Sequence, residues 1–382
     1  MRKANDMSMD NPFVTKGYAG PEYFCDRVNE TQQLVELTTN GNNMALISPR
    51  RVGKTDLIHH CFGQPEIRER YYTFHIDIYA TTSMRDFVNV FGKAILDELK
   101  PKGRTTWERF LNILRSVRSE ITYDITGTPS WSIGLGDITN PSATLDEIFT
   151  YLNTADRPCM VAIDEFQQIT KYTDGVNVEA TIRTYMQKCI NATFIFAGSQ
   201  RHLMGEIFTS PSRPFYQSVL IMNLQPISID KYVEFAQRQF AKYDKRIESE
   251  VVMEVYNMFD AVTSCIQRVL NVLFLKTPQG GACTVDMVQG AVDYIIALFS
   301  ETYETLLEKI PEKQREVLRA IANAGQAREV TGKNFITRYR LQTASVVSAA
   351  LRGLLEKDFV TQDKDVYSVY DPFFAFWLKQ RE

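Results

Sequence analysis

The stretch Met44-Ala-Leu-Ile-Ser-Pro-Arg-Arg-Val-Gly-Lys-Thr-Asp-Leu-Ile58 decides the fold. Its first four residues are apolar and predict a short buried strand, and its end begins a helical pattern. Gly53, Lys54 and Thr55 match the end of the pattern G-x-x-x-x-G-K-[ST], with Ser48 in place of the first glycine. A strand before this tripeptide and a helix after it predict a phosphate-binding loop.

Such a loop binds phosphate oxygens with its backbone N–H groups and with the N-terminus of the helix that follows. We expect Lys54 to reach the β- and γ-phosphates and the Thr55 hydroxyl to bind Mg²⁺. The residues expected at the nucleotide are Ser48, Pro49, Arg50, Arg51, Val52, Gly53, Lys54, Thr55 and Asp56. The alternative is a chance Gly-Lys-Thr in a basic loop, which the flanking strand and helix disfavour.

Two acidic residues, Asp164 and Glu165, follow an apolar stretch, Cys159–Ile163, which is typical of a buried strand. Ligands of parallel α/β sheets bind at the carboxyl ends of the strands. We therefore expect Asp164 to bind Mg²⁺ beside Thr55, and Glu165 to orient and deprotonate the attacking water. Two solvated acids at a strand end are the alternative.

The next predicted strand, Thr193–Ala197, is followed by polar residues that would lie between the two motifs. Ser199 or Gln200 could sense the γ-phosphate there, although a plain polar turn is the alternative. An arginine that stabilises transition-state charge is also expected. The candidates are Arg201, Arg213 and Arg268, of which we include Arg213 in the predicted catalytic set with Lys54, Glu165 and Ser199.

Short apolar runs separated by helical patterns predict βαβ units, and so an α/β fold with a parallel sheet and helices on both faces. The other expected strands are Tyr72–Tyr79, which carries Asp77 as a further Mg²⁺ candidate, and Ser218–Met222. Helices are expected over Asp56–Phe62 and Met84–Leu99. The pattern breaks between Lys100 and Pro141, where Glu120–Ile125 and Trp131–Leu135 alternate like a β-hairpin and predict an insertion over residues 100–141.

Beyond Ile229 the chain changes to helical patterns with no strand candidates before residue 300, which predicts a small helical lid domain. A winged helix is expected after it, because three helical segments precede a pair of strands. The expected lid helices are Tyr232–Phe240, Glu248–Met258, Ala261–Lys276 and Thr284–Phe299. The winged-helix elements are Tyr303–Ala324, Gly332–Arg338, Thr343–Lys357, Phe359–Gln362 and Val366–Tyr370.

Composition is that of a globular protein of more than one domain, with 382 residues, 44% hydrophobic and 23% charged. The net charge of −3 indicates no global basic field for nucleic acid or an anionic membrane. The polar N-terminus lacks the apolar core of a secretory signal, and no run approaches the roughly 20 apolar residues of a membrane span. Six scattered cysteines without metal spacing favour reduced thiols, so we expect a cytoplasmic protein.

The sequence resembles the archaeal and bacterial ATPases of the STAND branch of AAA+-related P-loop NTPases. Four stretches carry the resemblance: Phe24–Glu30, Pro49–Thr55, Ala162–Gln167 and Tyr370–Trp377. It implies ATP as the nucleotide, and it implies that Arg27 and Glu30 lie against base and ribose, with Phe24 near adenine. The chain departs from the family pattern at Asp26 and Ser48, where glycine is usual.

These expectations divide the chain into an N-terminal segment 1–20, an ATPase core 21–226, a helical lid 227–300 and a winged helix 301–382. The first hypothesis is an ATP-binding and ATP-hydrolysing switch: nucleotide holds core and lid closed, and hydrolysis releases the winged helix. A nucleotide-locked scaffold with very slow hydrolysis is the blander alternative. We expect a protein client, no membrane partner, and nucleotide-dependent homo-oligomers as an open option.

A different class of function is a DNA-binding regulator, or a mobile-element or defence-related ATPase, whose winged helix reads duplex DNA. Tight DNA contact needs cations on the third helix and wing. Here Arg338, Arg340 and Arg352 are available, but the end of the helix and the wing are crowded with acids: Glu356, Asp358, Asp363 and Asp365. This balance favours an intramolecular or protein-binding role.

Overall fold

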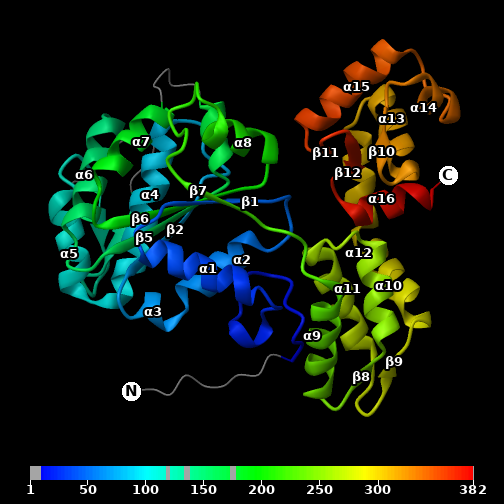
Figure 1. Cartoon of the computed structure of the whole chain (residues 1–382), viewed down its shortest axis with the longest axis horizontal. Coiled ribbons are helices and arrows are strands. Elements are labelled where there is room, and N and C mark those ends of the chain that lie inside the picture. The colour runs from blue at the N-terminus through cyan, green and yellow to red at the C-terminus, as the bar shows by residue number, and fades with distance from the viewer. Residues whose placement is uncertain (1–9, 118–120, 133–137, 173–177, 382) are drawn as a thin grey trace. The chain divides into compact units, whose positions relative to one another are not determined.

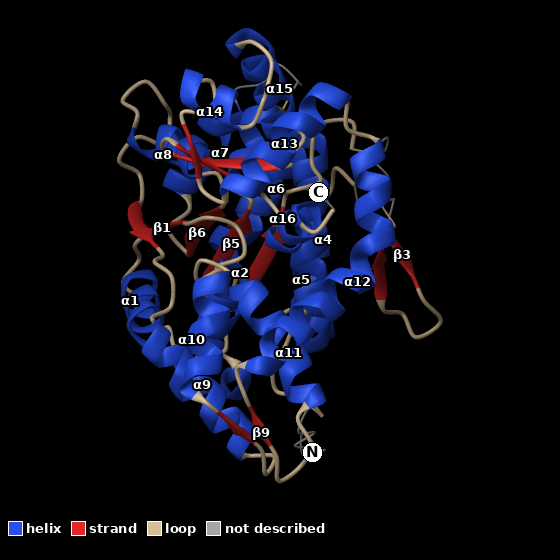
Figure 2. Ribbon diagram, turned by 90° about the vertical axis from the view of Figure 1, so that its right-hand side faces the viewer, coloured by secondary structure: helices blue, strands red, loops and turns tan. Residues whose placement is uncertain are grey.

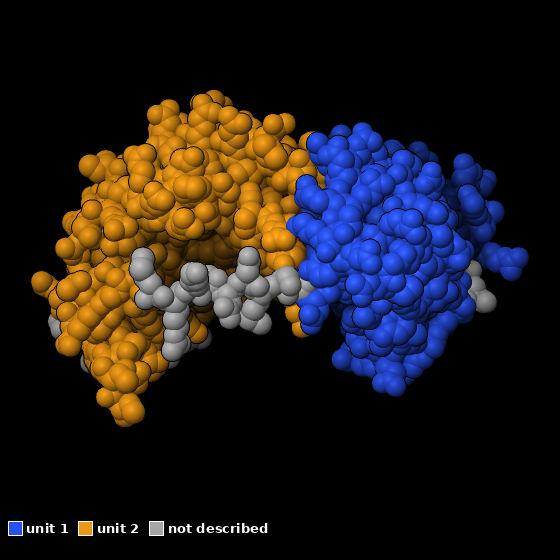
Figure 3. Space-filling view, turned by 90° about the horizontal axis from the view of Figure 1, so that it is seen from below, with its two compact units in different colours: residues 1–15, 228–382 blue, residues 16–227 orange. Residues whose placement is uncertain are grey.

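The structure is a computed structural model that describes residues 10–117, 121–132, 138–172 and 178–381. The chain forms two compact units, which Figure 3 distinguishes by colour. One unit, drawn in orange as unit 2 in Figure 3 and called the first unit below, is Lys16–Ile227. The other combines the described N-terminal residues up to Thr15 with Ser228 and the residues after it.

The first unit is built on a five-stranded parallel sheet in the order β2-β5-β6-β1-β7 (Figure 1). β1 and β5 are buried along their whole length, as expected for strands covered on both faces. Each strand overlaps a strand that the sequence predicts, and β1 matches it residue for residue. The strands are β1 (Met44–Ile47), β2 (Tyr72–Asp77), β5 (Cys159–Asp164), β6 (Ala192–Gly198) and β7 (Leu220–Asn223).

Helices cover both faces of this sheet, because alternate strand residues feed two separate cores. Leu46, Ala162 and Ile195 face one core, while Phe74 and Phe196 face the other. The first face is covered by α1 (Val28–Thr39), α2 (Lys54–Phe62) and α3 (Pro65–Arg68). The second is covered by α4 (Met84–Leu99), α6 (Pro141–Thr154), α7 (Val178–Lys188) and α8 (Arg201–Thr209). The predicted α/β class is confirmed.

The insertion between α4 and α6 contains a helix that the sequence reading missed, α5 (Arg104–Ile113), which buries Trp107 and Phe110. A hairpin forms there, but its strands differ from those predicted. β3 (Ile121–Tyr123) lies within the first predicted strand, and its partner β4 (Pro129–Trp131) overlaps the second only at Trp131. Residues 133–135 of the predicted second strand and residue 120 of the first lie outside the described residues. The hairpin projects from its surroundings in Figure 2, and Ile125 at its tip is fully exposed.

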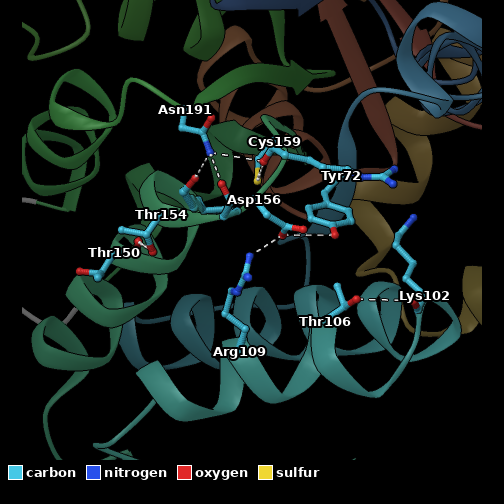
Figure 4. Close-up of polar contacts among 12 residues, drawn as sticks. Tyr72, Lys102, Thr106, Arg109, Thr150, Thr154, Asp156, Cys159 and Asn191 are labelled. Atoms are coloured by element: carbon cyan, nitrogen blue, oxygen red, sulfur yellow. Dashed lines mark hydrogen bonds and ion pairs between the residues drawn. The ribbon is translucent and has the colours of Figure 1, made fainter.

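Polar contacts tie α5 to the amino-terminal edge of the sheet (Figure 4). Arg109 Nη1 lies 2.7 Å from Asp156 Oδ1, and the Tyr72 hydroxyl donates to the same oxygen at 3.4 Å. Asn191 donates to the backbone carbonyls of Leu152, Ala155 and Arg157, which closes the turn before β5. The inserted helix is thus attached at the edge opposite the carboxyl ends of the strands.

The second unit begins with the helices α9 (Ile229–Ala241), α10 (Ser249–Met258), α11 (Thr263–Lys276) and α12 (Asp286–Glu308). The prediction of no strands here was wrong, because β8 (Arg246–Ile247) pairs in parallel with β9 (Ala282–Cys283). The predicted helix break near residue 300 was also wrong. Helix α12 runs through it to Glu308, and the next helix starts after Pro311, where proline favours a helix start.

The winged helix contains the predicted three helices and two strands: α13 (Glu312–Ala324), α14 (Lys333–Arg338), α15 (Ala344–Glu356), β11 (Val360–Asp363) and β12 (Val366–Val369). A short strand that the sequence reading missed, β10 (Ala327–Arg328), makes the sheet three-stranded in the order β10-β12-β11. A final helix, α16 (Pro372–Lys379), starts at an Asp371 cap that accepts a hydrogen bond from Phe373 N–H.

Aromatic side chains of α16 join the winged helix to the helical region of the same unit. Phe373 packs on Phe259 with ring centroids 4.8 Å apart, and Arg268 of α11 lies over both Phe299 and Phe373. At the start of the chain, Phe13 is fully buried against Phe235, Phe240 and Phe274 of this unit.

Candidate nucleotide site

The predicted loop connects β1 to α2 and turns through two left-handed residues, Arg51 with φ 67° and Gly53 with φ 88°. Glycine adopts this conformation without the steric penalty of a side chain. The Gly53 carbonyl accepts the first hydrogen bond of α2, from Leu57 N–H, so α2 begins at Lys54. The N-terminus of a nine-residue helix therefore opens at the loop, which is the arrangement that binds anions.

Lys54 is buried inside this loop, where its Nζ donates to the Pro49 carbonyl at 3.2 Å and approaches the Ser48 carbonyl at 3.4 Å. Burial lowers the pKa of the Lys54 ammonium, while Glu165 and Asp164 act to raise it and Arg50 and Arg201 act to lower it. A buried cation among backbone carbonyls gains further stabilisation from an anionic ligand.

The predicted Mg²⁺ residues lie together, since the Thr55 hydroxyl donates to Asp164 Oδ2 at 2.5 Å. Burial acts to raise the pKa of Asp164, but His75 and the Thr55 hydroxyl outweigh it and hold that pKa below its usual value. His75 Nε2 lies 3.7 Å from Asp164 Oδ2, so the two are neighbours without a hydrogen bond. An ionised carboxylate beside a hydroxyl is an oxygen donor set that fits Mg²⁺.

Glu165 follows Asp164 in the left-handed region, with φ 55°, and this strained backbone turns its side chain toward the end of β6. Its Oε2 accepts hydrogen bonds from Ser199 Oγ at 2.7 Å and from Gln167 Nε2 at 2.5 Å. Ser199 Oγ in turn accepts a hydrogen bond from Arg50 Nε at 3.0 Å. The structure thus brings Lys54, Thr55, Asp164, Glu165 and Ser199 to one edge of the sheet.

Arg27 lies at the start of α1, where it is 2% exposed and takes a left-handed conformation. Its guanidinium donates to Glu30, to the Val52 carbonyl of the loop and to the Gln225 carbonyl after β7. The hydrogen bonds of the Arg27 guanidinium are therefore made to groups of the protein rather than kept for a base or ribose. Phe24, expected near adenine, stacks on His60 of α2 with centroids 4.4 Å apart.

The remaining loop positions vary in environment: Ser48 is fully buried, Pro49 and Thr55 are exposed, and burial raises the pKa of Asp56. The exposed Asp77 accepts a hydrogen bond from Tyr79 N–H, and its backbone is in register with Asp164. Gln168 donates to the Thr81 carbonyl.

The structure separates the arginine candidates. Arg213 pairs with Glu179 of α7 and lies 3.5 Å from Glu206 of α8. Arg268 lies between aromatic rings of the second unit. Arg201, the first residue of α8, is near enough for its charge to lower the pKa of Lys54. Arg50 of the loop lowers that pKa in the same way. The catalytic role of Arg213 stays a prediction.

Two site residues escaped the sequence reading. His75 faces the α2 side of β2, where its ring centroid is 4.6 Å from that of His59. Its place beside β5 depends on strand pairing, which sequence spacing does not reveal. Gln167 is likewise not in the predicted site set, and it is 2% exposed because the turn after Glu165 folds it back. The short spacing from Glu165 to Gln167 was the available signal.

Comparison with known proteins agrees with this architecture. A family model described as "Probable winged helix domain" matches residues 301–380. A search among curated proteins finds no match. The solved Walker-type ATPase of Pyrococcus abyssi is 18% identical, with a TM-score of 0.63, covering 96% of this chain and 99% of that chain.

Two proteins of Aeropyrum pernix are also similar. Its ORC2 protein, solved as ADPNP-ADP complexes, is 12% identical with a TM-score of 0.58, covering 97% of this chain and 96% of that one. Its ORC1 protein, solved in complex with DNA, is 11% identical with a TM-score of 0.51 and covers 97% of each chain. The chain has the fold of a Walker-type ATPase. None of the helices in the described ranges has the length and apolar character needed to span a membrane.

Proposed function

We propose that this protein is an ATP-binding, Mg²⁺-dependent ATPase of the STAND type that acts as a molecular switch in the cytoplasm. The observation that carries the proposal is the cluster at the carboxyl edge of the sheet. A buried lysine lies in a loop at a helix N-terminus, a hydroxyl–carboxylate pair lies beside it, and a second carboxylate is held within reach by Ser199.

The residues of this chain divide the work of phosphoryl transfer. The amides of residues 50–56 and the Lys54 ammonium bind the phosphates, and Thr55 and Asp164 hold Mg²⁺. When bound, Mg²⁺ neutralises charge on the β- and γ-phosphates. Glu165 orients the attacking water and accepts its proton, and Ser199 keeps that carboxylate in place.

We propose that Arg27 acts on the nucleotide indirectly, by holding the Val52 carbonyl of the loop and the start of α1. Glu30 and Phe24 are then the residues of this element that lie nearest the base and ribose. Arg201 replaces Arg213 as the proposed arginine for transition-state charge, because the Arg213 guanidinium is engaged by Glu179 and Glu206.

The switch proposal needs one change from the sequence-based hypothesis. The lid (227–300) and winged helix (301–382) share α12 and the aromatic packing around Phe373. We propose that nucleotide acts on this unit as one body and that a protein client, or a second copy of the chain, reads its position. Release of the winged helix from the lid would require breaking that packing.

Phosphate release in the presence of Mg²⁺ and ATP tests the proposal. Lys54→Ala should abolish nucleotide binding, and Glu165→Gln should bind ATP but lower kcat by about 10²–10⁴-fold, the usual contribution of a positioned base. Lys188→Ala and Glu234→Gln are matched controls at exposed positions outside the site. Equal turnover in wild type and Glu165→Gln contradicts the catalytic role, and unimpaired ATP binding by Lys54→Ala contradicts the loop assignment.

Duplex DNA is the second candidate partner, as for a regulator or a mobile-element or defence-related ATPase. Helix α15 has no acidic residue before Glu356, and the exposed cations Lys333, Arg338 and Arg340 lie ahead of it in the chain. A gel shift that falls with salt and weakens in Arg338→Ala and Arg340→Ala would support DNA binding. No shift at low salt with nucleotide present would remove it.

A further inference from the structure

A hydrogen-bond chain joins the phosphate loop to the carboxylate proposed to activate water. Arg50 Nε donates to Ser199 Oγ at 3.0 Å, and Ser199 Oγ donates to Glu165 Oε2 at 2.7 Å. A hydroxyl has one proton to give and lone pairs to accept with, so Ser199 can serve both partners at once. The direction of the chain is set, because a guanidinium only donates and a carboxylate only accepts.

Each member of this chain is held by its surroundings. The Arg50 guanidinium carbon lies 5.5 Å from the centroid of the Tyr79 ring, a cation–π contact that restricts the side chain. Ser199 is 8% exposed, so its hydrogen bond to a carboxylate lies largely outside water and is strengthened. The three residues come from the ends of β1, β6 and β5, which only the folded sheet brings together.

Glu165 is anchored through one oxygen. Ser199 and Gln167 both donate to Oε2, and no hydrogen bond to Oε1 is present among the residues that the structure describes. This arrangement leaves Oε1 as the oxygen that can accept a proton from water, while Oε2 fixes the orientation of the carboxylate.

We infer that Arg50 is a positioning residue for Glu165 and acts through Ser199. The loop then has two functions. Its amides and Lys54 bind phosphate. The Arg50 side chain points to the end of β6 and, through Ser199, fixes the orientation of the Glu165 carboxylate that activates the attacking water. The inference rests on the proposed ATPase function and adds to it a coupling between the phosphate loop and Glu165.

A double-mutant cycle tests the coupling. Arg50→Met keeps a long apolar side chain but removes both the donor and the cation–π contact with Tyr79, and Ser199→Ala removes the hydroxyl that links Arg50 to Glu165. Each should lower kcat by about tenfold, the order expected when a contact in one network is lost, with little change in KM. The double variant should be no slower than Ser199→Ala alone. Additive losses, or a rise in KM with unchanged kcat in Arg50→Met, would overturn the inference.

Gln167 supplies the matched control, because it donates to the same oxygen of Glu165 without touching Arg50. The losses from Arg50→Met and Gln167→Ala should therefore approach additivity, unlike those from Arg50→Met and Ser199→Ala. Ser199→Thr retains the hydroxyl and should restore most of kcat. Failure of this rescue would count against a hydroxyl-mediated link.

A measurement without nucleotide separates the two proposals. Hydrogen exchange in Phe166–Lys171, the turn that follows Glu165, should quicken to a similar extent in Arg50→Met and Ser199→Ala. If wild type shows no Lys54-dependent hydrolysis, the ATPase proposal fails. The exchange rates still show whether Arg50 and Ser199 together hold Glu165. Unchanged exchange in Arg50→Met, with hydrolysis intact, would overturn the coupling alone.

Discussion

The carboxyl edge of the sheet and the aromatic cluster around α16 are built on opposite principles. At the sheet edge, polar and charged side chains such as Lys54, Asp164 and Ser199 are buried, and Glu165 takes a strained backbone conformation. At α16, the Phe373 ring packs on Phe259, and the Arg268 guanidinium lies over the Phe373 ring. Buried polar groups lower the stability of the fold but supply the reactive groups of the site, whereas packed aromatic rings stabilise the fold and fix its geometry.

The largest expected effect lies on the aromatic side of this contrast. Phe373→Ala removes a ring that is 2% exposed and should destabilise its unit by about 3–5 kcal/mol, because the cavity it leaves cannot close fully. Hydrogen exchange in peptides from α10 to α16 measures this loss. Phe376→Ala, at a half-buried ring of the same helix, should cost less. Equal destabilisation by the two substitutions would contradict a special role of Phe373 in this packing.

A smaller effect is expected in the phosphate loop. Gly53→Ala adds a Cβ that meets no atom within 4 Å, so its cost is the left-handed backbone alone, about 1–2 kcal/mol. Gly41→Ala is the matched control, with φ 81° and equally open space in the turn after α1. Thermal unfolding should show similar losses for both. Only Gly53→Ala should also weaken ATP binding, and an equal loss of binding in Gly41→Ala would contradict the site.

The smallest effect concerns pH. Burial lowers the pKa of His60 below the usual 6.5, so the unfolded chain takes up this proton first as the pH falls. The stability of the first unit should therefore decrease as the pH drops below 6.5. His60→Gln should reduce that dependence in urea titrations at pH 5.5 and 7.5, whereas His202→Gln, at an exposed position, should not. If stability depended more strongly on pH in His60→Gln than in wild type, the prediction would be wrong.

Local sequence patterns were enough to predict the strands of the five-stranded sheet and most of the helices. A buried parallel strand is a run of apolar residues, and α4 carries its own periodicity and a Ser83 cap, so its bounds matched the prediction. The strands that the sequence did not predict are of another kind. The short strands β8, β9 and β10 have two residues each and are stabilised only by their partners. Nothing in so short a segment distinguishes it from a turn.

What the sequence determined by itself is the loop at Ser48–Thr55 and the acids at Asp164 and Glu165, because a strand, a left-handed glycine and a helix start are all encoded within a few residues. What only the tertiary structure decided is how these groups meet. Arg50 reaches Ser199, and Arg213 is engaged by Glu179, through contacts between residues far apart in the chain. Such contacts depend on strand order and side-chain packing, which no local pattern carries.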